Sequence, residues 1–250
     1  RPSGTSSAPA PSRPSERAPA TVSVHARIRA AATDSTWLQR SLLAGLVLSV
    51  AWSTWSVSPT DLTARVVRDV VVFLLAPGVL AVTHGRRLGY RIDRLAVRDT
   101  LLLAAFVLPF YLVGSSLPSI RAYYPMWQTS TALGSFLPHT LQQLAVVVAA
   151  ETYYRGLLCV GVGDEFGFKS VFISPVVYAL HHVGKPPVEL LLSGPTDVLF
   201  GAVDYHSGSI LPSIVAHGLG LTLLDWLTLH DPLFPPERVV AALRWLPVPL

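Results

Sequence analysis

A glutamate and an arginine stand one helical turn apart near the middle of an apolar run. The run covers residues 140–162 and contains no charged side chains other than Glu151 and Arg155. Ionisable groups at membrane depth are costly, so they usually persist because they pair or take part in chemistry. The i,i+4 spacing places both groups on one helix face, where a charge-assisted hydrogen bond can form. A buried ion pair that only holds helices together would show the same pattern.

Histidines occur in the next apolar segments. His181 and His182 lie in the segment FKSVFISPVVYALHHVG, and His217 lies in SGSILPSIVAHGLGLTLLDWL. A carboxylate or an imidazole held in a partly desolvated cavity is a competent general base. Together with Glu151 and Arg155, these histidines therefore predict a catalytic site within the bilayer.

Composition places the chain in a membrane. Hydrophobic residues make up 51% of the sequence and charged residues only 14%, and the mean hydropathy is +0.48. These values predict an all-α, polytopic transmembrane bundle of about seven or eight membrane segments, since about 20 apolar residues cross the hydrocarbon layer as a helix. The predicted segments are 37–57, 66–83, 100–117, 140–162, 168–184, 188–204 and 207–229, followed by a short interfacial helix at 237–246.

The two ends of the predicted domain differ in composition. Residues 1–35 are basic and rich in proline and serine, which predicts a disordered tail before a membrane domain at 36–250. Arginines gather before the first predicted span and in the loop 84–99, whereas the loop 56–64 holds no arginine. The excess of positive charge in cytoplasmic loops predicts a cytoplasmic N-terminus. No basic face alternates with stacking aromatics, so we expect membrane lipid and no nucleic acid as partners.

Three motifs in order carry a family resemblance. Glu151 to Gly156 resembles the EExxxRG motif of the CPBP family, which includes CAAX proteases and bacteriocin-processing (Abi) proteins. Tyr178 followed four residues later by His182 resembles the second motif, and the HVGKPPVE sequence that ends at Glu189 resembles its continuation in a bacterial branch. His217 is similar to the histidine of the third motif. The resemblance covers about residues 138–225.

The resemblance implies an intramembrane endopeptidase of glutamic type, formerly grouped with the metalloproteases, in a bacterial inner membrane. In that family a glutamate and the second-motif histidine activate water, and the third-motif histidine with an asparagine stabilises the oxyanion. It implies His182 and His217 as catalytic residues here, and mostly structural or substrate-orienting roles for Glu151 and Arg155. Because Glu151 is the motif glutamate that remains, we expect it to join the catalytic residues, with Arg155, Tyr178, Glu189 and His181 supporting them. The implied substrate is a membrane-proximal peptide or protein tail, either CAAX-like, a C-terminal sorting tail or a leader peptide.

Two positions depart from the family pattern. Ala150 occupies the place of the first motif glutamate, and Leu221 occupies the place of the asparagine four residues after His217. The losses remove a general base and an oxyanion donor, which together account for several orders of magnitude in rate. Three explanations stay open. Glu151 or Glu189 acts as the base, or the chain is an inactive homologue that binds a membrane peptide or lipid-anchored partner. The third is that the residue at position 150 was mutated to trap one state of the protein.

Other interpretations use the same residues differently. Glu151, His182 and His217 would supply three ligands to a zinc ion with one open position, although no HExxH motif is present. Apart from this zinc alternative, we expect no cofactor. Asp225 is expected near the membrane edge. Intramembrane charges can also mark the ion path of a transporter.

Overall fold

The computed structural model describes residues 36–250, and the predicted tail at 1–35 lies outside them. Helices form the described part, and no strand occurs between residues 36 and 250. The predicted all-α fold class is therefore confirmed. The longest α-helices are α2 (Trp37–Thr54), α5 (Arg94–Gly114), α7 (Leu133–Glu151), α10 (Pro187–Ser207) and α11 (Leu211–Thr228).

Shorter helices join or extend the long ones. A continuous helical stretch consists of α3 (Leu62–Asp69), the π-helix η1 (Val70–Leu75) and α4 (Ala76–Thr83). After α7 the chain continues through the π-helix η2 and several short turns before α9. These are η2 (Thr152–Leu157), η3 (Val160–Val162), α8 (Gly163–Phe166), η4 (Gly167–Phe172) and α9 (Ser174–His181), while α6 (Pro118–Arg121) and α12 (Pro236–Leu243) stand at other connections.

Side-chain caps fix where several helices begin. Thr36 and Gln39 form a capping box, in which Thr36 Oγ1 accepts from the Gln39 amide at 3.3 Å and Gln39 Oε1 accepts from the Thr36 amide at 3.0 Å. Asp93 Oδ1 accepts from the Ala96 amide at 3.0 Å at the start of α5. These bonds satisfy amides that have no partner within the first helical turn. Gly208 ends α10 with a φ of +62°, a conformation that glycine adopts without strain.

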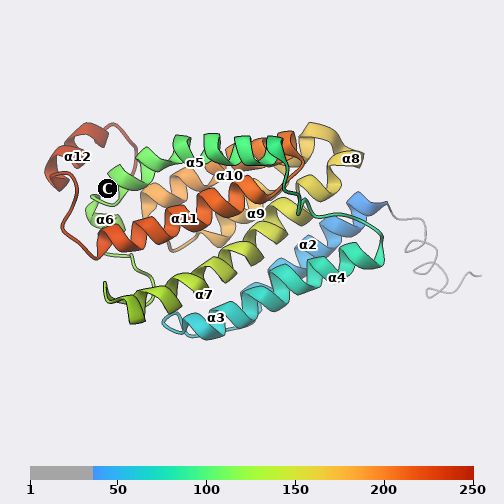
Figure 1. Ribbon diagram of the computed structural model, residues 1–250, viewed down its shortest axis with the longest axis horizontal. Helices are drawn as coiled ribbons and strands as arrows, with labels where there is room; N and C mark the ends of the chain where they lie inside the picture. The colour runs from blue at the N-terminus through green and yellow to red at the C-terminus, as the bar shows by residue number, and fades with distance from the viewer. Residues whose placement is uncertain (1–35) are drawn as a thin grey trace, which may run out of the picture. The chain divides into compact units, whose positions relative to one another are not determined.

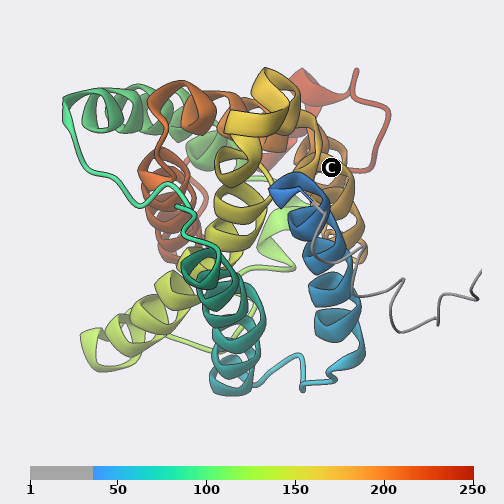
Figure 2. The same ribbon diagram turned by 90° about the vertical axis from the view of Figure 1, so that its right-hand side faces the viewer.

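The long helices pack along one another. In Figure 1, α5, α10 and α11 lie together, α7 crosses beside α11, and α2 and the α3 to α4 stretch run along the other side of α7. Helix α6 and α12 stand at one end of this bundle, whereas α8 stands at the other (Figure 1). Figure 2 views the bundle from the end that carries α8 and the beginning of α2. Helices α7, α9 and α11 thus bring the three sequence motifs into one bundle.

Among residues 36–250, three helical stretches are long and apolar enough to cross a membrane. They are Leu62–Thr83, Arg94–Gly114 and Leu133–Phe172, which contain or overlap the predicted segments 66–83, 100–117 and 140–162, and the last also reaches the beginning of 168–184. Helices also form at the predicted segments 37–57, 188–204 and 207–229, as α2, α10 and α11. Their crossing of the membrane, and hence the total of seven or eight segments, stays a prediction.

The predicted segment at 168–184 is not a continuous helix. Its chain forms the 3₁₀ turns of η4 and then α9, which has only eight residues. At 1.5 Å per residue, α9 is about 12 Å long, well short of the roughly 30 Å of hydrocarbon. The segment contacts η2 and α10 on one side, but its large apolar side chains are mostly exposed, namely Phe168, Phe172, Val176, Leu180 and Val183. Apolarity alone therefore does not show whether such a segment spans the membrane.

Apolar side chains cover much of the outer surface. Leu43, Leu46, Val79, Val82 and Leu101 are each more than half exposed. Soluble monomers rarely expose so many large apolar residues on neighbouring helices, whereas a lipid-facing surface requires them. Charged side chains instead lie inside the bundle, where Glu151, Arg155, Asp197, Asp204 and Asp225 are at most 1% exposed. The distribution supports an integral membrane protein.

Candidate active site

The first motif lies where a helix changes its winding. Glu151 is the last residue of α7, and the next six residues, TYYRGL, form the π-helix η2. Short π-helical segments inside longer helices occur frequently at functional sites, because they reorient the side chains that follow. Gly156 lies against the loop 84–93, where an added Cβ would be 3.1 Å from the carbonyl oxygen of Leu88. The motif glycine therefore allows that loop to pack against η2.

Glu151 and His217 form a hydrogen-bonded pair between α7 and α11. His217 Nδ1 lies 2.6 Å from Glu151 Oε1, so the imidazole donates to the carboxylate. The Glu151 side chain is fully buried, whereas 23% of the His217 side chain is exposed. A histidine that donates from Nδ1 carries its lone pair on Nε2 when the imidazole is neutral. The arrangement can therefore hold a basic nitrogen at the accessible side of a buried carboxylate.

Arg155 contacts two carboxylates. Its Nε lies 3.6 Å from Glu151 Oε2, as the i,i+4 spacing predicts, but its closer partner is Asp197, with 2.5 Å between Nη1 and Oδ1. Ser174 Oγ donates to the other oxygen of Asp197 at 2.5 Å. Arg155 thus links η2 to α10, and Ser174 links the start of α9 to the same carboxylate. Sequence reasoning missed the role of Asp197, whose signal was an aspartate in the middle of an apolar helix.

His182 has a fixed orientation next to this cluster. Its Nδ1 donates to the carbonyl of Tyr178 at 2.8 Å, and its Nε2 lies 3.7 Å from Glu189 Oε1. His182 makes no hydrogen bond to Glu151 or His217, but it lies close enough for electrostatic interaction with both. The Tyr178 ring joins the two groups, because its centroid lies 4.1 Å from that of His182 and 5.4 Å from Arg155 Cζ.

Glu189 belongs to a second polar cluster beside His182. Lys185 Nζ lies 2.7 Å from Glu189 Oε1, and Tyr124 donates to Glu189 Oε2 at 2.8 Å. Burial, together with the neighbouring Glu189 carboxylate, raises the pKa of Tyr124 well above its usual value, so the phenol stays protonated as a donor. Lys185 and Tyr124 therefore neutralise and orient Glu189, which makes it a poor free base and a good positioning group for His182.

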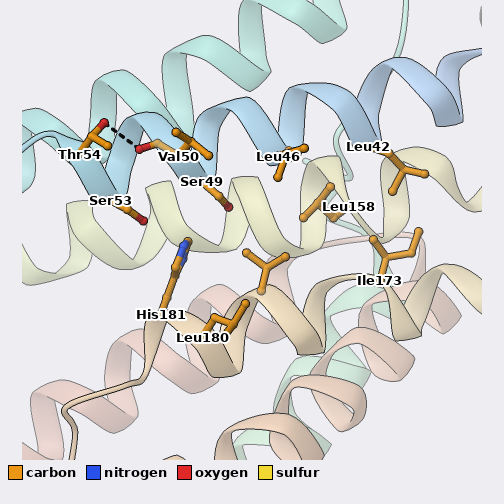
Figure 3. Close-up of a pocket in the computed structure, with 12 residues that line it drawn as sticks. Leu42, Leu46, Ser49, Val50, Ser53, Thr54, Leu158, Ile173, Leu180 and His181 are labelled. Atoms are coloured by element: carbon orange, nitrogen blue, oxygen red, sulfur yellow. Dashed lines mark hydrogen bonds between the residues drawn. The ribbon is translucent and has the colours of Figure 1, made fainter.

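His181 lies on the other side of α9, away from this cluster. Tyr154 donates to His181 Nδ1 at 2.5 Å, and the His181 ring stacks on Trp52 of α2 with 4.5 Å between centroids. His181 lines an apolar groove of about 400 Å³ between α2 and α9. Figure 3 shows His181 pointing across this groove towards α2. Leu42, Leu46, Val50, Ile173 and Leu180 line the rest of the groove.

Asp225 lies inside the bundle, and its expected position near the membrane edge stays a prediction. Its side chain is fully buried, and its Oδ2 accepts from His139 Nε2 at 2.7 Å and from Gln143 Nε2 at 2.8 Å. Both partners lie on α7, one turn apart. The cluster ties α11 to α7 because a buried carboxylate needs donors, and the sequence position of Asp225 near the end of α11 gave no sign of them.

The two positions that depart from the family pattern carry apolar side chains in packed surroundings. Ala150 packs against the aromatic cluster that contains Tyr153 and Tyr154, and Leu221 packs against the cluster that contains Leu224. Neither position supplies a base or a donor. Within the described part of the chain, Glu151 is thus the motif carboxylate that forms a hydrogen bond with a motif histidine.

The zinc alternative gains no support from this geometry. Glu151 is occupied by His217 and Arg155, and His182 is directed to Tyr178 and Glu189. Across residues 36–250 no three histidine, cysteine, aspartate or glutamate side chains are grouped so that they could hold a metal ion. A catalytic zinc ion needs three such ligands around one point.

Comparison with known families supports the motif assignment. Residues 126–221 match the family described as type II CAAX prenyl endopeptidase Rce1-like. Comparisons with curated proteins and with solved structures give no match. The matched range contains Glu151, Arg155, His182, Glu189 and His217, and so carries all three motifs. The match confirms the predicted resemblance of this chain to the CAAX protease family over residues 126–221.

Proposed function

We propose that the protein is an intramembrane endopeptidase that hydrolyses a peptide bond of a membrane-associated protein or peptide. The family match supports protease activity in general. The observation that carries the specific proposal is the pair of Glu151 and His217, with a buried carboxylate on Nδ1 of a partly exposed imidazole. This pair replaces the general base that Ala150 lacks.

In the proposed reaction His217 is the general base and Glu151 is its positioning residue. His217 Nε2 takes a proton from water, and the hydroxide forms a bond to the scissile carbonyl carbon while the carbonyl π electrons move to oxygen. When this intermediate collapses, the carbon–nitrogen bond breaks and the imidazolium returns the proton to the leaving amine. Glu151 stabilises the imidazolium in the meantime, since its 2.6 Å contact brings the two opposite charges together in a buried site.

Arg155 and His182 support this reaction from opposite sides. Arg155 holds Glu151 ionised and in place through their 3.6 Å contact, and Asp197 holds Arg155. His182, fixed by Tyr178 and Glu189, is a second imidazole available for proton transfer near the pair. The substrate proposed from the family match is a tail anchored next to the membrane, either CAAX-like, a sorting tail or a leader peptide. We propose a bacterial inner membrane with a cytoplasmic N-terminus as the location.

A non-catalytic role on the same scaffold is the second candidate function. Ala150 and Leu221 remove two groups of the family pattern, and the apolar groove between α2 and α9 is large enough to hold part of a lipid-anchored partner. This candidate predicts binding of such a partner without cleavage.

A cleavage assay in liposomes separates the two candidates. A panel of fluorogenic C-terminal tail peptides, with and without a lipid group, would be incubated with the wild-type protein and with His217→Ala. Cleavage by the wild type that is lost in His217→Ala is the expected result. Binding of a lipidated tail by both proteins with no cleavage by either would instead establish the non-catalytic role.

A further inference from the structure

A tyrosine on α5 lies beside the position where the family asparagine is missing. A Cβ added at Gly220 would overlap the ring and hydroxyl of Tyr111, so the hydroxyl end of this ring lies directly against the backbone of α11. Gly220 precedes Leu221, the position of the missing oxyanion donor, and follows His217 by three residues. Because Gly220 has no side chain, the phenol of Tyr111 can pack against α11 about one helical turn from His217, the proposed base.

Packing holds the Tyr111 ring in this place. The ring contacts one apolar cluster that includes Val188 and Leu224, and another that includes Phe200 and Ala216. Its neighbours come from α10 and α11 as well as from α5, and α5 and α11 are in contact along much of their length. A ring enclosed by three helices has few rotamers available, so the hydroxyl is a preorganised group.

The Tyr111 hydroxyl is an unpaired donor on a partly exposed residue. It makes no hydrogen bond within residues 36–250. The buried side-chain atoms without a partner in that range do not include it. Both Glu151 and Glu189 lie close enough to act on it electrostatically. The hydroxyl is therefore an unused donor near both carboxylates.

We propose that Tyr111 is a catalytic residue whose hydroxyl donates a hydrogen bond to the oxyanion formed during peptide cleavage. The phenol is a neutral donor at physiological pH, and no proton is transferred in this step. The carbonyl oxygen gains the π electron pair when the new carbon–oxygen bond forms, and the O–H group of Tyr111 stabilises that charge until the carbon–nitrogen bond breaks. This assignment rests on the proposed peptidase function and supplies the donor that Leu221 cannot.

The test compares Tyr111→Phe with a matched control in the liposome cleavage assay. Tyr111→Phe keeps the ring and removes only the hydroxyl, so kcat is expected to fall by about 10²-fold to 10³-fold, the usual loss when one oxyanion donor is removed. KM and the melting temperature are expected to stay unchanged, because the hydroxyl has no partner in the free protein. Tyr205→Phe, on α10, is the control, since the Tyr205 hydroxyl also makes no hydrogen bond to the described residues.

A rescue experiment distinguishes a donor from a packing residue. Adding Leu221→Asn to Tyr111→Phe restores an N–H donor at the family position, and kcat is expected to recover. An unchanged kcat in Tyr111→Phe, or an equal loss in Tyr205→Phe, overturns the assignment while leaving the peptidase function intact if the wild type still cleaves. If the wild type cleaves no tail peptide, the proposed function has failed and the role of Tyr111 falls with it.

Discussion

Replacing Glu151 by glutamine isolates the role of the buried carboxylate. The substitution keeps the size of the side chain, and the amide must then satisfy two neighbours. Arg155 lies 3.6 Å from Oε2 and carries only donors, so the amide oxygen is expected to face Arg155 and the NH₂ group to face His217. An NH₂ donor at the 2.6 Å position requires a lone pair on Nδ1, which places the proton of His217 on Nε2. The imidazole then has no lone pair for water.

The expected loss follows from this change of tautomer. In the serine protease triad, the corresponding carboxylate-to-amide change lowers kcat by about 10⁴ with the geometry intact. A similar loss here corresponds to about 5.5 kcal/mol of transition-state stabilisation, at about 1.4 kcal/mol for each factor of ten. Stability should change much less, because Arg155 keeps its 2.5 Å contact with Asp197.

The assay is steady-state cleavage of a tail peptide in liposomes, with a melting curve for each protein. Glu237→Gln is the matched control, since Glu237 is exposed at the start of α12 and makes no contact with the site. Wild-type activity in Glu151→Gln, alongside an inactive His217→Ala, would refute the view that the carboxylate sets the tautomer of His217.

Three other substitutions and one treatment test the same contacts. Ala150→Glu should raise cleavage by about 10²-fold to 10⁴-fold by restoring the family base, and the gain should vanish in a double variant with His182→Ala; an unchanged rate would mean that position 150 no longer faces the substrate. Arg155→Ala leaves two buried carboxylates without a cation and should cost about 3–5 kcal/mol in thermal unfolding, so an unchanged melting temperature contradicts the buried network. Asp225→Leu leaves His139 and Gln143 unpaired and should cost about 1–3 kcal/mol for each donor, whereas a stable variant would show that water reaches these groups. Treatment with EDTA should leave both cleavage and melting unchanged, and loss of cleavage that added zinc restores would revive the zinc alternative.

The sequence predicted contacts that depend on local spacing. The i,i+4 relation put Glu151 and Arg155 on one face, and the structure places their charged atoms 3.6 Å apart. The order of the motifs identified His217 as the third-motif histidine, and in the structure His217 contacts Glu151. Helix period and motif spacing determine such relations before any tertiary structure is known.

Contacts between distant helices were not predictable in this way. Asp197 lies 42 residues from Arg155 and looked like an interruption of an apolar helix, yet it is the closest partner of the guanidinium. Asp225 was expected near the membrane edge, and its position in the sequence gave no indication that His139 and Gln143 of α7 hydrogen-bond to its carboxylate. Helix packing decides both cases, and a single sequence holds no record of which faces meet.

The segment 168–184 shows a different limit. Its apolar composition predicted a membrane span, but the chain forms η4 and an eight-residue helix instead. A short helix with an exposed apolar face is as apolar as a helix that spans the membrane, so hydropathy cannot distinguish them.

The central claim is that Glu151 and His217 act as one unit on the attacking water. A cycle of four proteins tests it directly, with kcat/KM measured in liposomes for the wild type, Glu151→Gln, His217→Ala and the double variant. Groups that work as a unit are strongly non-additive, so the double variant should be no slower than His217→Ala alone. If the two losses multiply instead, each residue acts independently and the proposed pair is wrong.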